Sequence, residues 1–170
     1  MSNIPLHPLI VHFTMGVVLI LPIITCTVLL LIHLKKATGT ALLFVLIVHA
    51  GLAVSVNLSS AMGERDERVI AKLTDKNSHH QNFIDSRLID NELVASHEEE
   101  AGIFMIINYV FLLISIGLYG GKLSTIKKIA ILFMQSLLIY FAYNVATSGG
   151  KLVYLHGAAK AFINLKFGIQ

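Results

Sequence analysis

Histidine is the residue type in this chain whose number and placement most directly suggest chemistry. The sequence contains eight histidines, and four of them lie at the ends of long apolar runs: His7, His12, His97 and His156. Neutral imidazole is the commonest side-chain ligand of metal ions, and histidine is also an axial ligand of haem iron. These four residues are therefore the candidate ligands of a metal ion or a haem.

Helical spacing suggests how two of these histidines could face a cofactor. His12 and Gly16 share one face of a helix, and the missing side chain of Gly16 would leave room for a flat ring beside the imidazole. His7 lies about 140° from His12 around an ideal helix. However, Pro8 suits the first helical turn, so His7 could sit just outside the helix and turn inward. We therefore expect both imidazoles to face the interior.

Two further segments carry patterns that fit an interior site. One is a helical stripe that begins at the third candidate histidine: His97, Ala101, Phe104 and Asn108. The other is a groove of small residues, which close helix packing in membranes also favours: Gly51, Ser55 and Ser59. Of the other histidines, His33 is expected to reach water at the end of its helix. His49 lies within an apolar run, and we expect it to bond to an interior amide: Asn108, Gln135 or Asn144.

The elements that must hold these residues are four apolar runs. The chain of 170 residues is 55% hydrophobic, with a mean hydropathy of +0.75, and only 14% of its residues are charged, against about 25% in soluble domains. The runs approach or exceed the ~18 residues that mark a membrane span, and they cover residues 9–32, 41–62, 101–119 and 126–147. Because lipid offers no hydrogen bonds, such runs become helices. The sequence predicts an all-α, integral membrane four-helix bundle that forms a single membrane domain over residues 1–170.

Short connections divide the four predicted helices into two hairpins, and a long polar segment, 63–100, joins the hairpins. This segment shows helical spacing and is expected to be helical outside the membrane. It holds all ten acidic residues of the chain. The short connections and their flanks carry lysines and no acid: Lys35, Lys36, Lys122, Lys127 and Lys128. The positive-inside rule then predicts that segment 63–100 and both termini are external, in a multi-pass protein of a bacterial inner membrane.

Some classes of protein and site are disfavoured by the sequence. The first run lacks a basic segment before it and is long for a signal peptide, so we expect it to remain as a span. The formal net charge of +3 averages two different faces and is no argument for nucleic-acid binding. The single cysteine, Cys26, cannot form an internal disulfide. Nothing resembles a nucleophilic triad, so an electron-transfer or binding protein is expected rather than a stand-alone enzyme.

Two terminal motifs resemble those of a known family. Residues 6–13, LHPLIVHF, and residues 149–159, GGKLVYLHGAA, are similar to the N-terminal and C-terminal signatures of the DUF2231 family of predicted bacterial membrane proteins. The sequence departs from these signatures at Thr14, where the family usually has proline, and at Lys160, where a small apolar residue is usual. The resemblance implies four helices and no established activity.

Together these features favour a small b-type cytochrome that transfers electrons. One or two haem b groups would be held near the external face by two or more of the four histidines, with three candidate partners for the propionates: Arg65, Arg68 and Lys151. Besides the lipid bilayer, a quinone and an external cytochrome are the candidate partners, and the chain could belong to an oligomer or a larger membrane complex.

Two alternatives stay open at this point. The first is a non-haem zinc, copper or iron site in a transporter or sensor, with Glu64 and Glu98 as additional ligands. The second is a structural subunit that binds no cofactor.

Overall fold

Four long helices make up nearly all of the described chain. The computed structural model describes residues 7–76, 91–119 and 124–154. Its helices are α1 (His7–His33), α2 (Ala41–Lys76), α3 (Asn91–Tyr119) and α4 (Thr125–Tyr154), and these residues contain no strand. The predicted all-α four-helix fold is thereby confirmed.

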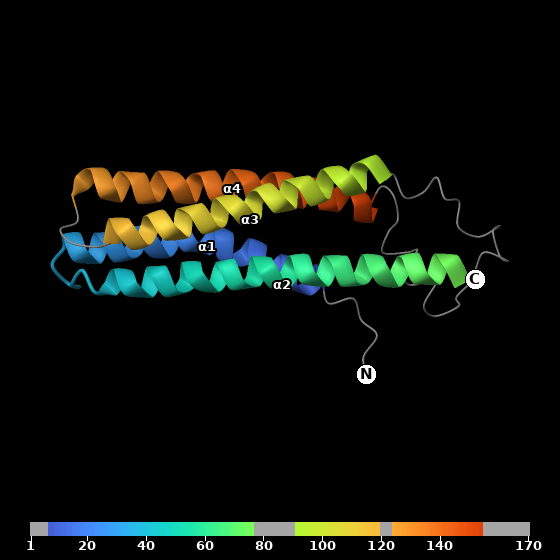
Figure 1. The fold of residues 1–170 in the computed structure, drawn as a ribbon. Helices are drawn as coiled ribbons and strands as arrows, with labels where there is room; N and C mark the ends of the chain where they lie inside the picture. Colours follow the sequence, from blue (N-terminus) through green and yellow to red (C-terminus); the bar gives the residue numbers. More distant parts are fainter. Residues whose placement is uncertain (1–6, 77–90, 120–123, 155–170) are drawn as a thin grey trace, which may run out of the picture.

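The helices form a bundle of two antiparallel hairpins (Figure 1). α1 packs along α2 and α3 packs along α4, while contacts of α1 with α4 and of α2 with α3 close the ring. Among the described residues, α1 has no such contact with α3, nor α2 with α4. These two pairs therefore lie on the diagonals of the bundle, and a site between diagonal helices would occupy its interior.

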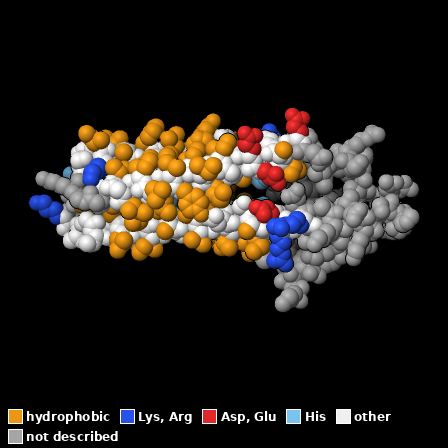
Figure 2. Space-filling view, in the orientation of Figure 1, with side chains coloured by type: hydrophobic (Ala, Val, Ile, Leu, Met, Phe, Trp, Pro, Cys, Tyr) orange, Lys and Arg blue, Asp and Glu red, His pale blue; other side chains and the backbone are white. Residues whose placement is uncertain are grey.

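The outer surface of the bundle is apolar along most of its length. All four helices are long and apolar enough to cross a membrane, over His7–His33, Ala41–Arg65, Glu92–Tyr119 and Thr125–Leu152. On the face shown in Figure 2, hydrophobic side chains cover the middle, lysine or arginine lies at one end, and the acidic residues lie at the other end together with further lysine or arginine. The chain is thus a multi-pass membrane protein, and its exposed apolar side chains face lipid. Its helices pair their backbone N–H and C=O groups internally, as the lipid environment requires.

Two helices extend beyond the spans expected from sequence. α2 continues without a break to Lys76, and α3 already begins at Asn91. The ends of the predicted segment 63–100 therefore prolong the helices above the apolar belt, and residues 77–90 lie outside the described part. At the opposite end, α1 stops where Lys35 adopts a left-handed conformation with φ 57°, which lets the chain turn into α2.

The interior face of each helix is set by helical periodicity. On α1 the buried side chains recur every three or four residues: Thr14, Val18, Leu21, Thr25 and Val28. The predicted stripe on α3 also turns inward, since Phe104 and Asn108 are buried and His97 and Ala101 are half-buried. The core therefore contains polar side chains among aliphatic ones.

Candidate functional site

His7 is held against α2 at the end of the bundle where α1 begins. Its Nδ1 lies 2.8 Å from the carbonyl oxygen of Ser59. Its ring also lies over Gly63, where an added Cβ would come within 3.1 Å of the imidazole Cε1. A Cβ at this position would make the ring give way by a few tenths of an ångström, so the glycine of α2 favours the close approach of a histidine on α1.

His97 makes the corresponding contacts in the second hairpin. Its Nδ1 lies 2.9 Å from the hydroxyl of Ser148 on α4. The ring lies so close to Gly149 that a Cβ there would be 2.9 Å from Cε1. In each hairpin, then, a histidine of the first helix packs against a glycine of the second, at the end of the bundle away from the short connection.

The hydrogen bonds of these two imidazoles determine which ring nitrogen is free. A carbonyl oxygen only accepts, so Nδ1 of His7 carries the proton and donates it to Ser59. The Ser148 hydroxyl donates to backbone carbonyls, at 3.3 Å from Asn144 and 3.1 Å from Val145, and so accepts from His97. In both neutral rings the lone pair is therefore on Nε2. When a histidine binds a metal through one ring nitrogen, the N–H of its other ring nitrogen usually donates a hydrogen bond that fixes the orientation of the ring.

The two imidazoles belong to one region of the bundle. His7 and His97 lie on diagonal helices, yet they are close enough to interact electrostatically. Glu100, one turn after His97 on α3, interacts electrostatically with His97 as well. Its Oε2 is buried and has no hydrogen-bond partner, although buried carboxylate oxygens normally have one. Two Nε2 lone pairs and an unpaired carboxylate oxygen thus gather at this end.

A complete metal site is not formed by the described residues alone. No three His, Cys, Asp or Glu side chains in that part of the chain lie close enough together to hold an ion. The fourth candidate ligand, His156, lies outside the described residues. The arrangement is therefore a pair of oriented imidazoles with a nearby carboxylate, which suits axial ligation of a haem or part of a metal's ligand set.

The expectation that His12 faces inward is wrong. Its side chain is exposed, and its Nδ1 donates to the Pro8 carbonyl at 2.6 Å on the same helix. The reason is rotational: Thr14 is buried, and two residues correspond to about 200° around a helix, which turns His12 to the lipid side. Gly16 does leave open space, since no atom lies within 4 Å of an added Cβ, but that space lies off the buried stripe of α1.

The acidic and basic partners expected from sequence also differ from those in the structure. Glu64 is exposed and pairs with Arg68 at 3.2 Å, and Glu98 is exposed. The carboxylate beside the histidines is that of Glu100, which sequence reasoning missed although it lies one helical turn from His97. Lys151 is exposed, so no basic side chain expected to pair with a propionate lies inside the bundle.

His49 has the kind of neighbour that was predicted for it. It is 2% exposed and lies beside Asn108. The pair lacks a hydrogen bond of normal geometry, because His49 Nε2 and both amide atoms of Asn108 have no partner. His33 is exposed at the other end of α1, as expected.

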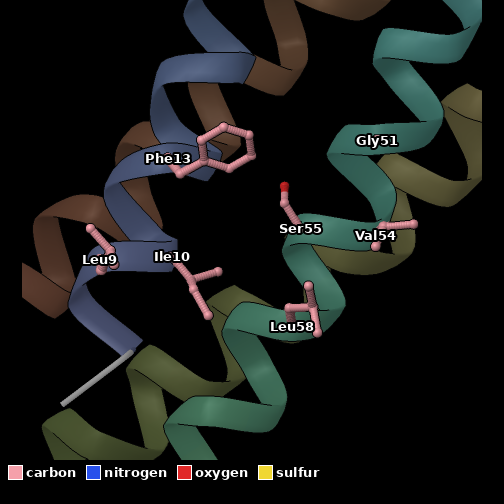
Figure 3. A pocket seen from close by; sticks show the side chains of 7 residues that line it. All are labelled: Leu9, Ile10, Phe13, Gly51, Val54, Ser55 and Leu58. Carbon is pink, nitrogen blue, oxygen red and sulfur yellow. The ribbon is translucent and has the colours of Figure 1, made fainter. Parts of the chain in front are cut away.

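An apolar groove lies between α1 and α2, and two of its lining residues, Leu9 and Leu58, are close in sequence to His7 and Ser59 (Figure 3). It holds about 480 Å³ and is lined from α1 by Leu9, Ile10 and Phe13, and from α2 by Gly51, Val54, Ser55 and Leu58. Ser55 donates its proton to the Leu52 carbonyl at 2.8 Å. The groove can therefore take hydrocarbon but offers little for a polar headgroup.

Comparison with known protein families, with curated proteins and with solved structures found no match to this chain.

Proposed function

We propose that this protein is a small membrane cytochrome that binds haem b through His7 and His97 and transfers electrons. The observation that carries the proposal is that both imidazoles, on diagonal helices, have Nδ1 engaged in an interhelical hydrogen bond, which would leave the Nε2 lone pair for a ligand. Two axial imidazoles leave no open position on iron, which is suited to electron transfer rather than substrate binding. The haem would supply the redox chemistry, while the protein supplies ligands of fixed orientation.

The surroundings of the two histidines support a redox role in a membrane. The α1–α2 groove is lined by apolar side chains and would suit the hydrocarbon tail of a quinone. The acidic residues gather at the same end, where they would attract a basic external cytochrome. The motifs that resemble DUF2231 contribute His7 and Gly149 to this region.

We also propose that this end faces the outside of a bacterial inner membrane, with both termini external. The lysines at the other end support this orientation. In a Cys26→Ser background, single cysteines at Ser96 and Thr38, both exposed, should react differently with an impermeant thiol reagent in intact cells. Labelling at position 96 but not at 38 is expected, and the reverse pattern would refute the orientation.

A non-haem metal ion is the second candidate, and the unpaired Oε2 of Glu100 favours it. Two imidazoles and one carboxylate would supply part of the ligand set of iron or zinc, and a further ligand would be needed, because no three such side chains of the described residues lie close enough together to hold an ion. Such an ion would need both histidines and Glu100, whereas a haem would need only the histidines. A Glu100→Gln variant therefore separates the two candidates: it should keep a haem and lose most of a metal ion.

The test of the cofactor is a visible spectrum of the purified protein, oxidised and then reduced with dithionite. A sharp low-spin α band on reduction is expected. His7→Ala and His97→Ala should each lose the band or change its spin state, while His33→Ala, an exposed histidine at the other end, should leave it unchanged. Full haem retention in both ligand variants would refute the site. A colourless protein with bound zinc, copper or iron would support the second candidate. A protein with neither haem nor metal would favour a structural subunit that binds no cofactor.

A further inference from the structure

A second group of polar side chains lies inside the bundle, away from His7 and His97. Each helix contributes one member: Thr25 from α1, His49 from α2, Asn108 from α3 and Gln135 from α4. All four are at most 2% exposed. We call them the interior polar layer. Polar residues that face the interior of a membrane bundle are costly to place there, so a function is the default expectation.

The four residues lie at similar depth. Counted along their helices from the lysine-bearing end, at about 1.5 Å per residue, each lies about 12–17 Å in from the terminus of its helix. The described residues include no other His, Asp, Glu, Lys or Arg at this depth. The layer is therefore a single level of the bundle, and His49 is its ionisable member.

Hydrogen bonding within the layer is incomplete. Gln135 donates from Nε2 to the Thr25 hydroxyl at 2.8 Å, and Thr25 donates to the Leu21 carbonyl at 2.9 Å. Four buried atoms have no partner: His49 Nε2, Asn108 Nδ2, Asn108 Oδ1 and Gln135 Oε1. These atoms belong to three different helices, so the deficit is a property of the bundle interior and not of one helix surface.

The donor or acceptor character of each unpaired atom determines which kind of molecule could form hydrogen bonds with all of them. Asn108 Nδ2 is a donor, Asn108 Oδ1 and Gln135 Oε1 are acceptors, and His49 Nε2 is either, depending on its tautomer. An occupant must therefore both donate and accept. A metal cation could use the amide oxygens and one imidazole nitrogen but would leave the Asn108 Nδ2 donor unpaired, and the layer offers no cationic donor for an anion. A small neutral molecule with donor and acceptor capacity is left.

We propose that the interior polar layer is a binding site for water, which bridges Asn108 and Gln135 to His49. A buried water typically makes about two to four hydrogen bonds, and the four unpaired atoms of the layer can supply them. Water in contact with the imidazole lets His49 exchange its ring proton inside the membrane, as a proton relay requires. This proposal is independent of the haem proposal, because it involves neither His7 nor His97.

The test is water-edited solid-state NMR of the full chain in lipid bilayers, with labelled side-chain amides, imidazoles and valine methyls. Magnetisation from water should reach the amide groups of Asn108 and Gln135 and the ring of His49. It should not reach the methyls of Val18, which is buried on α1 at 2% exposure and lies about 10 Å along the helix from Thr25. In D2O the ring protons of both His49 and the half-buried His97 should exchange.

A matched variant checks that the water depends on the layer. Asn108→Leu keeps the branching of the side chain but removes a donor and an acceptor, so water transfer to Gln135 should fall at least severalfold. Two outcomes would overturn the proposal. In the first, water magnetisation reaches His97 in the unmodified chain but does not reach Asn108 or Gln135, which would show that the layer holds no water. The other is undiminished transfer to Gln135 in a folded Asn108→Leu variant.

Discussion

The contact between His97 and Gly149 can be tested with two neighbouring glycines of α4. An alanine Cβ at Gly149 would lie 2.9 Å from the Cε1 of His97, whereas at Gly150 nothing lies within 4 Å of it. Both glycines are inside the same helix. The pair Gly149→Ala and Gly150→Ala therefore differs in one respect, namely whether the imidazole must move.

The magnitudes follow from two terms of known size. In a helix interior alanine is favoured over glycine by about 0.8–1.0 kcal/mol, and this gain applies to both variants. In Gly149→Ala the ring must shift, which breaks the hydrogen bond to Ser148, worth about 0.5–1.5 kcal/mol. Gly150→Ala should thus raise the free energy of unfolding by up to about 1 kcal/mol. Gly149→Ala should leave this free energy near that of the unmodified chain.

The assay is reversible unfolding in mixed detergent micelles, followed by far-ultraviolet circular dichroism, with imidazole nitrogen shifts measured in parallel. The His97 shifts should change in Gly149→Ala and stay constant in Gly150→Ala. If the two variants gained equal stability with unchanged His97 shifts, the close packing of this ring on α4 would be refuted.

Two more predictions use the same logic elsewhere in the bundle. Gly63→Ala should displace the ring of His7, because its Cβ would lie 3.1 Å from Cε1; changed His7 nitrogen shifts would confirm this, and unchanged ones would contradict it. Thr25→Val should lower the free energy of unfolding by about 1–2 kcal/mol, because Gln135 loses its acceptor. Thr14→Val, at an equally buried threonine that bonds only to its own helix, should cost less, and equal losses in the same detergent titration would contradict the role of Thr25.

Polar contacts between helices carry particular weight in this fold. Lipid is as apolar as the core, so burial of aliphatic side chains gives little drive for helices to associate. Interhelical hydrogen bonds in membrane proteins average about 0.6 kcal/mol each. The bonds of His7 to Ser59, His97 to Ser148 and Gln135 to Thr25 connect α1 to α2, α3 to α4, and α4 to α1. The candidate ligands thus also hold the hairpins together.

The sequence by itself determined the helices. Runs such as 9–32 and 41–62 are too apolar for water, and lipid requires every backbone N–H and C=O to be paired within the segment. Relations within one helix were also predictable, because the spacing of His97, Phe104 and Asn108 places them on one face whatever the partner. The stripe on α3 is therefore found as expected.

Only the tertiary structure decided which faces turn inward and which residues meet. In a soluble bundle the polar side of each helix reveals its rotation, but here the lipid-facing and core-facing sides are both apolar. For that reason the exposure of His12 was predicted wrongly, and Glu100 was overlooked in favour of Glu64. The approach of His7 to Gly63 joins residues far apart in sequence, and it depends on how two helices pack, which no spacing along one helix encodes.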